Sequence, residues 1–490
     1  MTVSSKRRAQ VRMAAAACVL PLMLGGAALH AQEPAAPVAP VPAPLRPPIP
    51  PLTPAQAETA LAVLRTADAQ GLQTRDYLPA DPADTRALTE GLLRYARDVR
   101  IGRMEEGDFP SNWRLRPEAY DPSPELAQAL AADRLKPWLD SLPPPYSGYA
   151  ALKRGLAKYR QIAADGGWKP IPEGPPLKLG MDDPRVVALR ARLAVEDPLV
   201  KASGGTAFDA ELHGAVQRAQ RRFGFEPDGV VGAGTLRMLN QPVGQRVLQI
   251  IANMERWRWM PREMPATRVQ VNSGAAIVTL FRDDRPVLSM KAVSGKPGDE
   301  TPMLASAMHS VVLNPPWNVP TRIANEELWP KERANPGYLS RNGFRVITND
   351  DGSKRLQQRS EQSALGRYKF DFDNPFAVYL HDTPTKATFE RFSRQASHGC
   401  VRVEKPRELA EALLAGDPQW TPEQIAATLD SGKTVRARLP AQVPVYILYW
   451  TAFAAADGQM HFRTDPYDWD RDLLRRVGVL APAKTPAQEA

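Results

Sequence analysis

The first half of the chain carries apolar residues at helical spacing. Thr53 and Pro54 have the residue types of a helix N-cap and first turn, and an Ala- and Leu-rich run continues from them to Leu64. Further helical periods extend over residues 84–100 and 149–163. We therefore expect an all-α domain over residues 55–175.

Residues 176–243 have a different pattern, which predicts three short helices separated by turns. The apolar positions that share one helix face are Val186, Leu189 and Leu193 in the first helix and Leu212, Val216 and Ala219 in the second. A turn sequence over 228–232 precedes the third helix, and a helical connector is expected over 244–261.

Beyond residue 261 the pattern indicates β-structure. Val269 and Val271 alternate with polar residues, and runs rich in β-branched and apolar residues follow. These runs lie at 277–281, 287–293, 310–313, 377–380 and 443–449. Together they predict a mostly β domain over 262–470, followed by a C-terminal tail over 471–490. The predicted fold class is α+β with several domains.

A long polar and charged stretch interrupts the β pattern between Pro320 and Tyr368. It has few strand signals, and loops longer than about 12–15 residues are usually functional or disordered. We expect residues 322–367 to form a lid.

The N-terminal residues have the pattern of an export signal. Four basic residues precede an apolar, Ala-rich run over 13–29, and Ala31 is a small residue at the cleavage edge. A membrane anchor is the alternative, but the run is short for a bilayer span of about 20 residues. We expect a signal peptide over residues 1–31 and a periplasmic location. Ten of the 49 prolines lie between Pro34 and Pro54, which predicts a linker over 32–54.

Composition and charge exclude some classes of protein. The chain has 490 residues, 43% hydrophobic and 24% charged, which rules out wholesale disorder. Loss of Lys6, Arg7, Arg8 and Arg12 with the signal peptide would lower the net charge from +9 to about +5. This mild excess suits an anionic polymer or membrane surface, but it is weak for a nucleic-acid binder. We therefore expect no nucleic-acid partner.

Cysteine usage singles out one residue. Cys18 lies in the predicted signal peptide, so the mature chain carries only Cys400 and cannot form an internal disulfide. Burial as a small hydrophobe is the commonest role of a free cysteine. An unpaired thiol in an oxidising compartment is liable to oxidation, however, so its presence there suggests a functional role.

The neighbours of Cys400 favour catalysis. His381 and His398 are both candidate bases, because an imidazole can lower a thiol pKa well below about 8.5. Gly399 permits a tight turn that presents the thiol at a strand end, with backbone N–H groups facing a reacting carbonyl. This arrangement predicts acyl transfer through a cysteine.

The same residue types allow a second interpretation. His381, Asp382, His398 and Cys400 could be zinc ligands, but their spacing matches no ordinary zinc pattern. We therefore expect neither a metal nor an organic cofactor. Of the other histidines, His213, His309 and His461 stand alone and are expected to be surface or packing residues.

The segment Ser397–Arg402, preceded by His381 with 15 residues between His381 and Ser397, resembles the active-site signature of the L,D-transpeptidases that remodel peptidoglycan. The resemblance extends to residues 293–296 with Thr301-Pro302, to residues 314–320 and to residues 253–261. With its helical domains the chain is similar to the large Gram-negative form of this family. That resemblance implies a capping subdomain over the active site, supplied by residues 322–367.

Residues 177–240 resemble a small three-helix peptidoglycan-binding domain. The family usually has an aromatic residue before the glutamine of the second helix, whereas this chain has Ala219 before Gln220. Glycan binding and a role as a three-helix spacer therefore both stay open for this domain.

The resemblance implies a role for each residue of the signature. Cys400 would be the nucleophile, His381 its base, and the backbone carbonyl of Asp382 the group that orients the His381 ring. His398 would be a supporting hydrogen-bond partner, and the N–H groups of Gly399 and Cys400 would form an oxyanion hole. The candidates for contact with the stem peptide are Arg402, Tyr379, Trp317 and Ser397, each of which could instead be structural.

The implied reaction joins the third residues of two peptidoglycan stems. A tetrapeptide stem would be the acyl donor, losing its terminal D-alanine, and the diaminopimelate amine of a neighbouring stem would be the acceptor. With water as the acceptor, the same site would act as an L,D-carboxypeptidase. With a lipoprotein amine as the acceptor, it would act as a lipoprotein-to-peptidoglycan ligase. The alternative from another class is a non-catalytic wall-binding scaffold. Partnership with other cell-wall enzymes stays open.

Overall fold

The computed structural model describes residues 48–455 and 457–481, all of which fall in one compact unit. The predicted signal peptide and most of the predicted proline-rich linker lie outside the described residues. Among the residues that are described, no helix has the length and apolar character that a membrane span requires.

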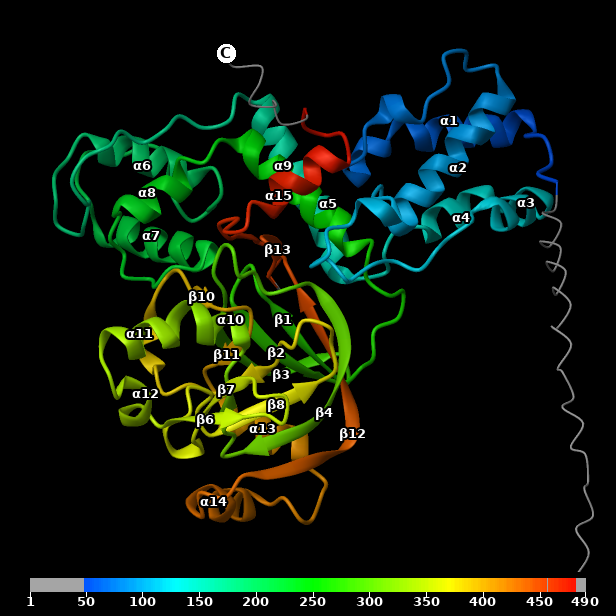
Figure 1. Cartoon of the computed structure of the whole chain (residues 1–490). Helices are drawn as coiled ribbons and strands as arrows, with labels where there is room; N and C mark the ends of the chain where they lie inside the picture. Colours follow the sequence, from blue (N-terminus) through cyan, green and yellow to red (C-terminus); the bar gives the residue numbers. More distant parts are fainter. Residues whose placement is uncertain (1–47, 456, 482–490) are drawn as a thin grey trace, which may run out of the picture. The chain divides into compact units, whose positions relative to one another are not determined.

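The N-terminal described residues are helical (Figure 1). Their helices are α1 Pro54–Arg65, α2 Thr85–Ile101, α3 Ser123–Ala131, α4 Leu135–Ser141 and α5 Ser147–Ala164. Thr53 caps α1 as predicted: its side chain accepts a hydrogen bond from the Gln56 N–H, and the Gln56 side chain accepts one from the Thr53 N–H. The predicted helices over 84–100 and 149–163 are confirmed as α2 and α5. The sequence pattern missed the short helices α3 and α4.

Helix α5 belongs to a different hydrophobic core from α1 to α4. Tyr149, Leu152 and Leu156 of α5 are buried with residues of helix α9, Val243–Trp257. Helix α5 also contacts strand β13, Ala452–Ala454, and lies beside α9 in Figure 1. It is therefore one of the elements that connect the N-terminal helices to the rest of the unit, together with a bridge between Trp113 and Met303.

Three helices follow, as predicted, between α5 and α9. They are α6 Arg185–Ala194, α7 Ala210–Phe223 and α8 Ala233–Leu239. Ala219 is completely buried in their core, so this position cannot line a surface groove. Gln220 also points inward: its amide nitrogen donates to the Val230 carbonyl at 3.0 Å, and its oxygen accepts from the Gly229 N–H at 2.8 Å. Gln220 therefore holds the turn that precedes α8.

A nine-stranded sheet forms the β-rich region. Its strands, in spatial order, are β10 Gln395–Ser397, β3 Arg285–Gly295, β11 Val401–Val403, β9 Leu380–His381, β8 Tyr368–Phe372, β4 Leu304–Leu313, β12 Val435–Leu448, β1 Arg268–Asn272 and β2 Ile277–Arg282. Strand β2 pairs with both β1 and β3, so the sheet closes on itself. Helices α13 Pro406–Leu414 and α14 Pro422–Asp430 accompany it. The predicted α+β multidomain class is confirmed.

One predicted strand is shorter than expected. The pattern predicted a strand over 377–380, but Ala377 has a φ of 53°, in the left-handed region, and the strand begins only at Leu380. The backbone bends at Ala377, which places the following residues against β11.

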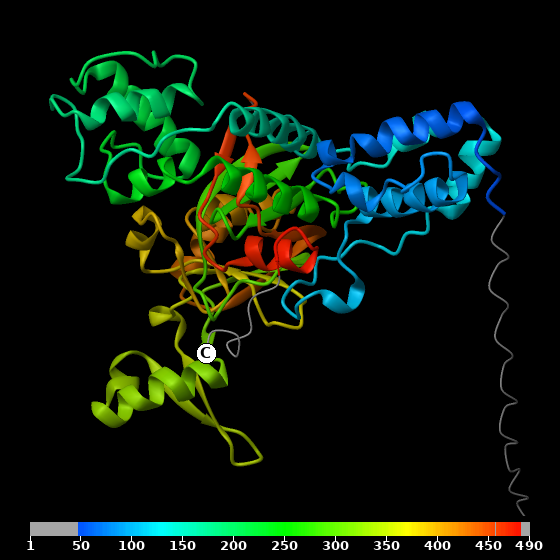
Figure 2. The same cartoon turned by 90° about the horizontal axis from the view of Figure 1, so that it is seen from above.

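The expected lid is an ordered subdomain rather than a long loop. Its elements are β5 Trp317–Asn318, α10 Thr321–Ile323, a π-helical turn Ala324–Leu328, α11 Trp329–Ala334, α12 Tyr338–Arg341, β6 Phe344–Thr348 and β7 Lys354–Gln358. Strand β7 pairs with both β5 and β6. Ile323, Leu328 and Leu356 are buried in a small core of its own. Figure 2 shows this segment, in yellow-green, with its helices beside its strands. We call residues 317–358 the capping subdomain.

The C-terminal region is also more ordered than predicted. Strand β14, Met460–Phe462, pairs with β13, and helix α15, Trp469–Arg476, follows. Leu473 and Leu474 are buried, so the segment expected as a tail from residue 471 starts inside a packed helix.

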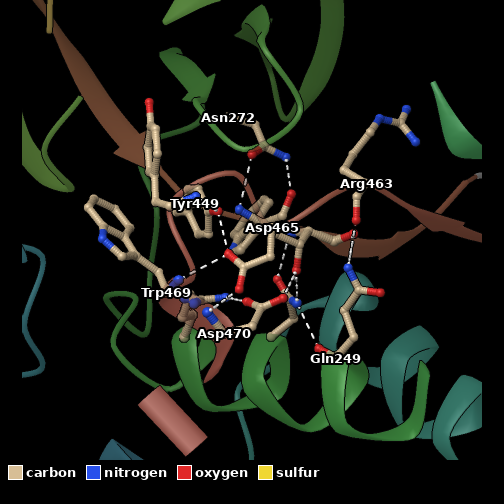
Figure 3. A network of polar contacts seen from close by, with 12 residues as sticks. Gln249, Asn272, Tyr449, Arg463, Asp465, Trp469 and Asp470 are labelled. Atoms are coloured by element: carbon tan, nitrogen blue, oxygen red, sulfur yellow. Dashed lines mark hydrogen bonds and ion pairs between the residues drawn. The ribbon is translucent and has the colours of Figure 1, made fainter. Parts of the chain in front are cut away.

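A buried polar network joins α15 to the rest of the unit (Figure 3). Asp470 accepts from Arg256 of α9 at 2.5 Å and from the Thr451 hydroxyl at 2.6 Å. Asp465 accepts from the Tyr449 hydroxyl at 2.5 Å and from the Trp469 N–H at 3.0 Å. The two carboxylates lie close together, and Asp470 donates its own backbone N–H to Asp465.

Candidate active site

The sequence candidates meet in one cavity of about 550 Å³ between the sheet and the capping subdomain. The lining includes Cys400, His381, His398, Ser397, Arg402, Tyr379 and Trp317. The capping subdomain contributes Glu327, Lys331 and Tyr338 to the same lining. Asp382 and Gly399, for which backbone roles were expected, do not line it.

The turn that carries Cys400 requires glycine at position 399. Cys400 lies between β10 and β11, and Gly399 before it has a φ of 104°. A Cβ placed there would meet its nearest neighbours only at 3.7 Å. The backbone conformation, and not a lack of space, is therefore what demands glycine.

Two hydroxyl groups hold this turn in place. Ser397 Oγ donates to the Cys400 carbonyl at 2.5 Å and accepts from the Gly399 N–H at 3.2 Å. Thr301, which is completely buried, donates to the Gly399 carbonyl at 2.8 Å and accepts from the Gly295 N–H at 2.8 Å. The Gly399 N–H expected in the oxyanion hole is thus engaged by Ser397. The Cys400 N–H has no hydrogen-bond acceptor among the described residues.

His381 is buried at the end of β9 and oriented by the backbone. Its Nδ1 donates to the carbonyl oxygen of Asp382 at 2.5 Å, so Nε2 is the nitrogen that can accept a proton. The Asp382 carboxylate is occupied by the backbone N–H groups of Thr383 and Arg367 and by Lys386. Burial lowers the pKa of His381 to about 4, and the positive charge of Arg402 acts in the same direction.

The thiol of Cys400 is protonated in the free site. Burial raises the pKa of Cys400, and hydrogen bonding from Tyr379 opposes this effect. Cys400 Sγ lies 4.0 Å from the Ala377 carbonyl oxygen. Among the described residues no hydrogen bond joins Sγ to His381 or to His398. Thiol and imidazole are therefore both uncharged at neutral pH.

His398 contacts the capping subdomain instead of Cys400. Its Nε2 lies 2.6 Å from Glu327 Oε1, on the π-helical turn 71 residues earlier in the chain. Glu327 could not be predicted, because nothing in its local sequence pattern marks it and the contact depends on how the subdomain packs.

Three further candidates surround the thiol. The Tyr379 hydroxyl contacts both Cys400 and the Trp317 side chain, and its ring lies 5.6 Å from that of His381. Burial raises the pKa of Tyr379, so it stays a hydroxyl donor. The guanidinium of Arg402 faces the same cavity, and its buried Nε has no hydrogen-bond partner among the described residues. An unpartnered arginine in a cavity is suited to bind a carboxylate.

Of the isolated histidines, His461 stacks on Phe453 and His309 lies 3.6 Å from Asp373. Within residues 48–455 and 457–481, no group of three or more His, Cys, Asp or Glu side chains is placed to hold a metal ion.

Three segments of the chain match known domain families. Residues 266–425 match the L,D-transpeptidase catalytic domain, known as YkuD, residues 52–156 match a scaffold domain, and residues 182–239 match a peptidoglycan-binding domain. The chain is thus similar to the L,D-transpeptidase catalytic domain in its β-rich region and to the scaffold and peptidoglycan-binding domains in its two helical regions.

A curated relative carries the same class name. A protein of Haemophilus influenzae named "Putative L,D-transpeptidase" is 35% identical over 219 residues, which are 41% of this chain and 44% of that protein. The match therefore spans less than half the length of this relative.

Solved structures with detectable similarity are also L,D-transpeptidases. One from Mycobacterium smegmatis is 15% identical, with 37% of this chain and 58% of that chain covered and a TM-score of 0.20. Another, from Stackebrandtia nassauensis, is 13% identical, with 57% and 97% covered and a TM-score of 0.24. Because these TM-scores are low, no conclusion about this chain follows from the two structures.

Proposed function

We propose that the protein is an L,D-transpeptidase that links the third residues of neighbouring peptidoglycan stems through a thioester on Cys400. The observation that carries this proposal is the shared cavity of Cys400 and His381. His381 Nδ1 donates to the Asp382 carbonyl, which leaves Nε2 as the ring nitrogen that can act as a base. The match of residues 266–425 to the L,D-transpeptidase catalytic domain supports the same conclusion.

The first step is acylation of the enzyme. His381 Nε2 takes the thiol proton while Sγ attacks the carbonyl of the L-centred third residue of a tetrapeptide stem. The terminal D-alanine leaves with that proton, and a thioester remains. The step requires Sγ to approach Nε2 in the substrate complex, and catalytic hydrogen bonds of free enzymes commonly tighten only then. The free Cys400 N–H and the Tyr379 hydroxyl are donors for the developing oxyanion.

Arg402 is suited to hold the donor stem. Its buried Nε lacks a partner, and a guanidinium binds a carboxylate through two parallel hydrogen bonds. Trp317 and Tyr379 would pack against the peptide beside it. The second step transfers the acyl group from sulfur to the diaminopimelate amine of a neighbouring stem, and neither step requires a metal or an organic cofactor.

The location we propose is the periplasm, where these stems are found. The predicted signal peptide would export the chain, and the match of residues 182–239 to a peptidoglycan-binding domain supports association with the wall. Because Ala219 and Gln220 both face inward, glycan contact by this domain would have to use other residues.

A muropeptide profile tests the proposal. Purified enzyme acting on disaccharide-tetrapeptide should release D-alanine and form dimers linked between third residues. The Cys400→Ala variant should form none while still being retained by sacculi in a pull-down. Tripeptide without dimer would indicate L,D-carboxypeptidase activity, and a product only with a lipoprotein amine would indicate a ligase. Equal dimer yields from Cys400→Ala and the wild type would exclude Cys400 as the nucleophile. If both proteins were inactive but still bound sacculi, a non-catalytic scaffold would be favoured.

A further inference from the structure

Glu327 and His398 form a polar pair across the mouth of the cavity. Glu327 lies on the π-helical turn of the capping subdomain, and its Oε1 lies 2.6 Å from His398 Nε2. Both side chains are partly exposed, 36% for Glu327 and 26% for His398, and both line the cavity. The pair therefore shares its cavity with Cys400 and is accessible to solvent.

The charges around the cavity are unevenly distributed. Glu327 is the only Asp or Glu among the described residues that line it, whereas Arg322, Lys331 and Arg402 are all positive. Arg402 acts on His381 and Cys400 at the sheet side, where an arriving cation would be repelled. On the cap side Arg322 is already paired with Asp299 and Glu326, so Glu327 is the group of the lining that can attract a cationic ligand.

We propose that Glu327 is the binding residue for the acceptor amine, and that its pair with His398 receives the proton that this amine must lose. The inference rests on the proposed transpeptidase function and locates its second substrate. A primary amine arrives as an ammonium ion at neutral pH, and a carboxylate that is also bonded to an imidazole can bind this ion and then deprotonate it. His398 is a positioning residue that holds the carboxylate at the cavity.

The proposed step balances as follows. The ammonium gives one proton to the Glu327–His398 pair, and the neutral amine attacks the thioester carbonyl to form a C–N bond. The C–S bond then breaks, and Cys400 leaves as a thiolate. The second proton lost by the nitrogen returns to this sulfur through His381, which restores the thiol and imidazole. The proton held by the pair passes to solvent.

The other neighbours of Glu327 leave its second oxygen accessible. Lys331 Nζ is 3.9 Å from Oε2, and the Lys331 side chain is half exposed, so an ammonium ligand can replace it. Arg322 is engaged elsewhere, with Asp299 and Glu326. Glu326 is adjacent in sequence but does not line the cavity, which makes it a matched control.

The test separates acylation from transfer. Wild type, Glu327→Gln and Glu326→Gln enzymes are given disaccharide-tetrapeptide, and the thioester is measured by intact mass while dimer and hydrolysed tripeptide are quantified. We expect Glu327→Gln to form the thioester at the wild-type rate, with a dimer-to-tripeptide ratio lower by about tenfold or more, the effect of losing one charge-assisted contact. A higher acceptor concentration should restore the ratio, and Glu326→Gln should match wild type.

Two outcomes would overturn this inference while the proposed function stands. An unchanged ratio in Glu327→Gln would exclude acceptor binding, and a parallel loss of acylation and transfer would indicate that the pair only holds the cap closed. Glu327→Asp keeps the negative charge and should recover part of the dimer-to-tripeptide ratio. If the pair were purely structural, Glu327→Asp and Glu327→Gln would give the same ratio. Absence of any thioester in the wild type would instead reject the proposed function, and this inference with it.

Discussion

Arg402 and His381 lie directly opposite each other in the parallel pairing of β11 with β9. This register places a guanidinium that has an unpartnered Nε beside the proposed base, in a cavity where both are largely screened from water. The positive charge disfavours a second positive charge on the imidazole, in addition to the effect of burial. His381 is consequently held neutral, the form in which it can accept a proton.

The first prediction concerns the pH dependence of acylation. The pKa of His381 is lowered to about 4, so the imidazole stays a competent base well below the ordinary histidine value of about 6.5. We expect the rate of acylation of the wild type to fall on the acid side only near pH 4. Stopped-flow measurement of thioester formation between pH 3.5 and 8 provides the profile.

The Arg402→Gln variant is the comparison for this profile. Removal of the charge raises the pKa of His381, so the acid limb should move to higher pH, and loss of the guanidinium should weaken donor binding about tenfold or more. If the pH profile of Arg402→Gln, scaled to the same maximum rate, coincides with that of the wild type, Arg402 does not affect the pKa of His381.

The second prediction uses the lone thiol as a chemical label. Carbapenems present a strained acyl carbonyl, and attack by Cys400 opens the ring and retains the whole molecule on the enzyme. Intact-mass spectrometry should detect one adduct per chain. Cys400→Ala should show none, because the only other cysteine, Cys18, lies in the predicted signal peptide. Adduct on this variant would point to a different nucleophile.

The third prediction concerns the hydroxyl that holds the catalytic turn. Thr301→Val keeps the shape of the side chain but leaves the Gly399 carbonyl and the Gly295 N–H without their buried partner. We expect a loss of about 1–3 kcal/mol in the free energy of unfolding and about a tenfold slower acylation, because the turn at Gly399 is less well fixed. Denaturant titration and carbapenem acylation kinetics measure the two effects.

A matched substitution distinguishes fold from function at this turn. Thr235 is buried in the three-helix region and bonds to Gln220 and the Val230 carbonyl. Thr235→Val should cost similar stability yet leave the acylation rate unchanged. If both variants acylate at the wild-type rate, the Thr301 bond contributes to stability alone.

Much of the site could be predicted because its residues are close in sequence or carry a distinctive signature. Cys400 and Arg402 lie in the turn and strand that follow β10, and His381 lies in β9 earlier in the same signature. The φ of 104° at Gly399 agrees with the tight turn expected there. The cavity also contains Tyr379 and Trp317, as expected, although Trp317 is separated from the signature by more than 60 residues.

Other parts could not be predicted, because their positions depend on packing between distant segments. Glu327 lies in a polar stretch without a regular period, and only the small core around Ile323 and Leu356 brings it to His398. The expected strand over 377–380 is interrupted because Ala377 adopts a left-handed conformation that its residue type does not signal. Helix α15 was missed because its residues are mostly charged, with the apolar positions confined to one short face.

The last prediction concerns stability and the network of Figure 3. Burial raises the pKa of Asp465 to about 7, and the nearby negative charge of Asp470 adds to the effect. Between the ordinary aspartate value of 3.8 and about 7, the folded protein therefore binds more protons at this group than the unfolded chain does. The contribution of Asp465 to stability accordingly decreases as the pH rises through this window and is constant above it.

The Asp465→Asn variant isolates this contribution. Asparagine can still accept from the Tyr449 hydroxyl and the Trp469 N–H but carries no charge, so the variant should lose less stability than the wild type between pH 5 and pH 8. His381 contributes with the opposite sign, since its lowered pKa makes the fold more stable as the pH rises from about 4 to 6.5, but it does so equally in both proteins. Urea titrations at pH 5 and pH 8 measure the change in the free energy of unfolding. Asp468→Asn removes an exposed neighbouring carboxylate and should show the same change as the wild type. Equal pH dependence in Asp465→Asn and the wild type would mean that Asp465 is ionised in the fold, with its charge compensated by Arg256 through the shared network.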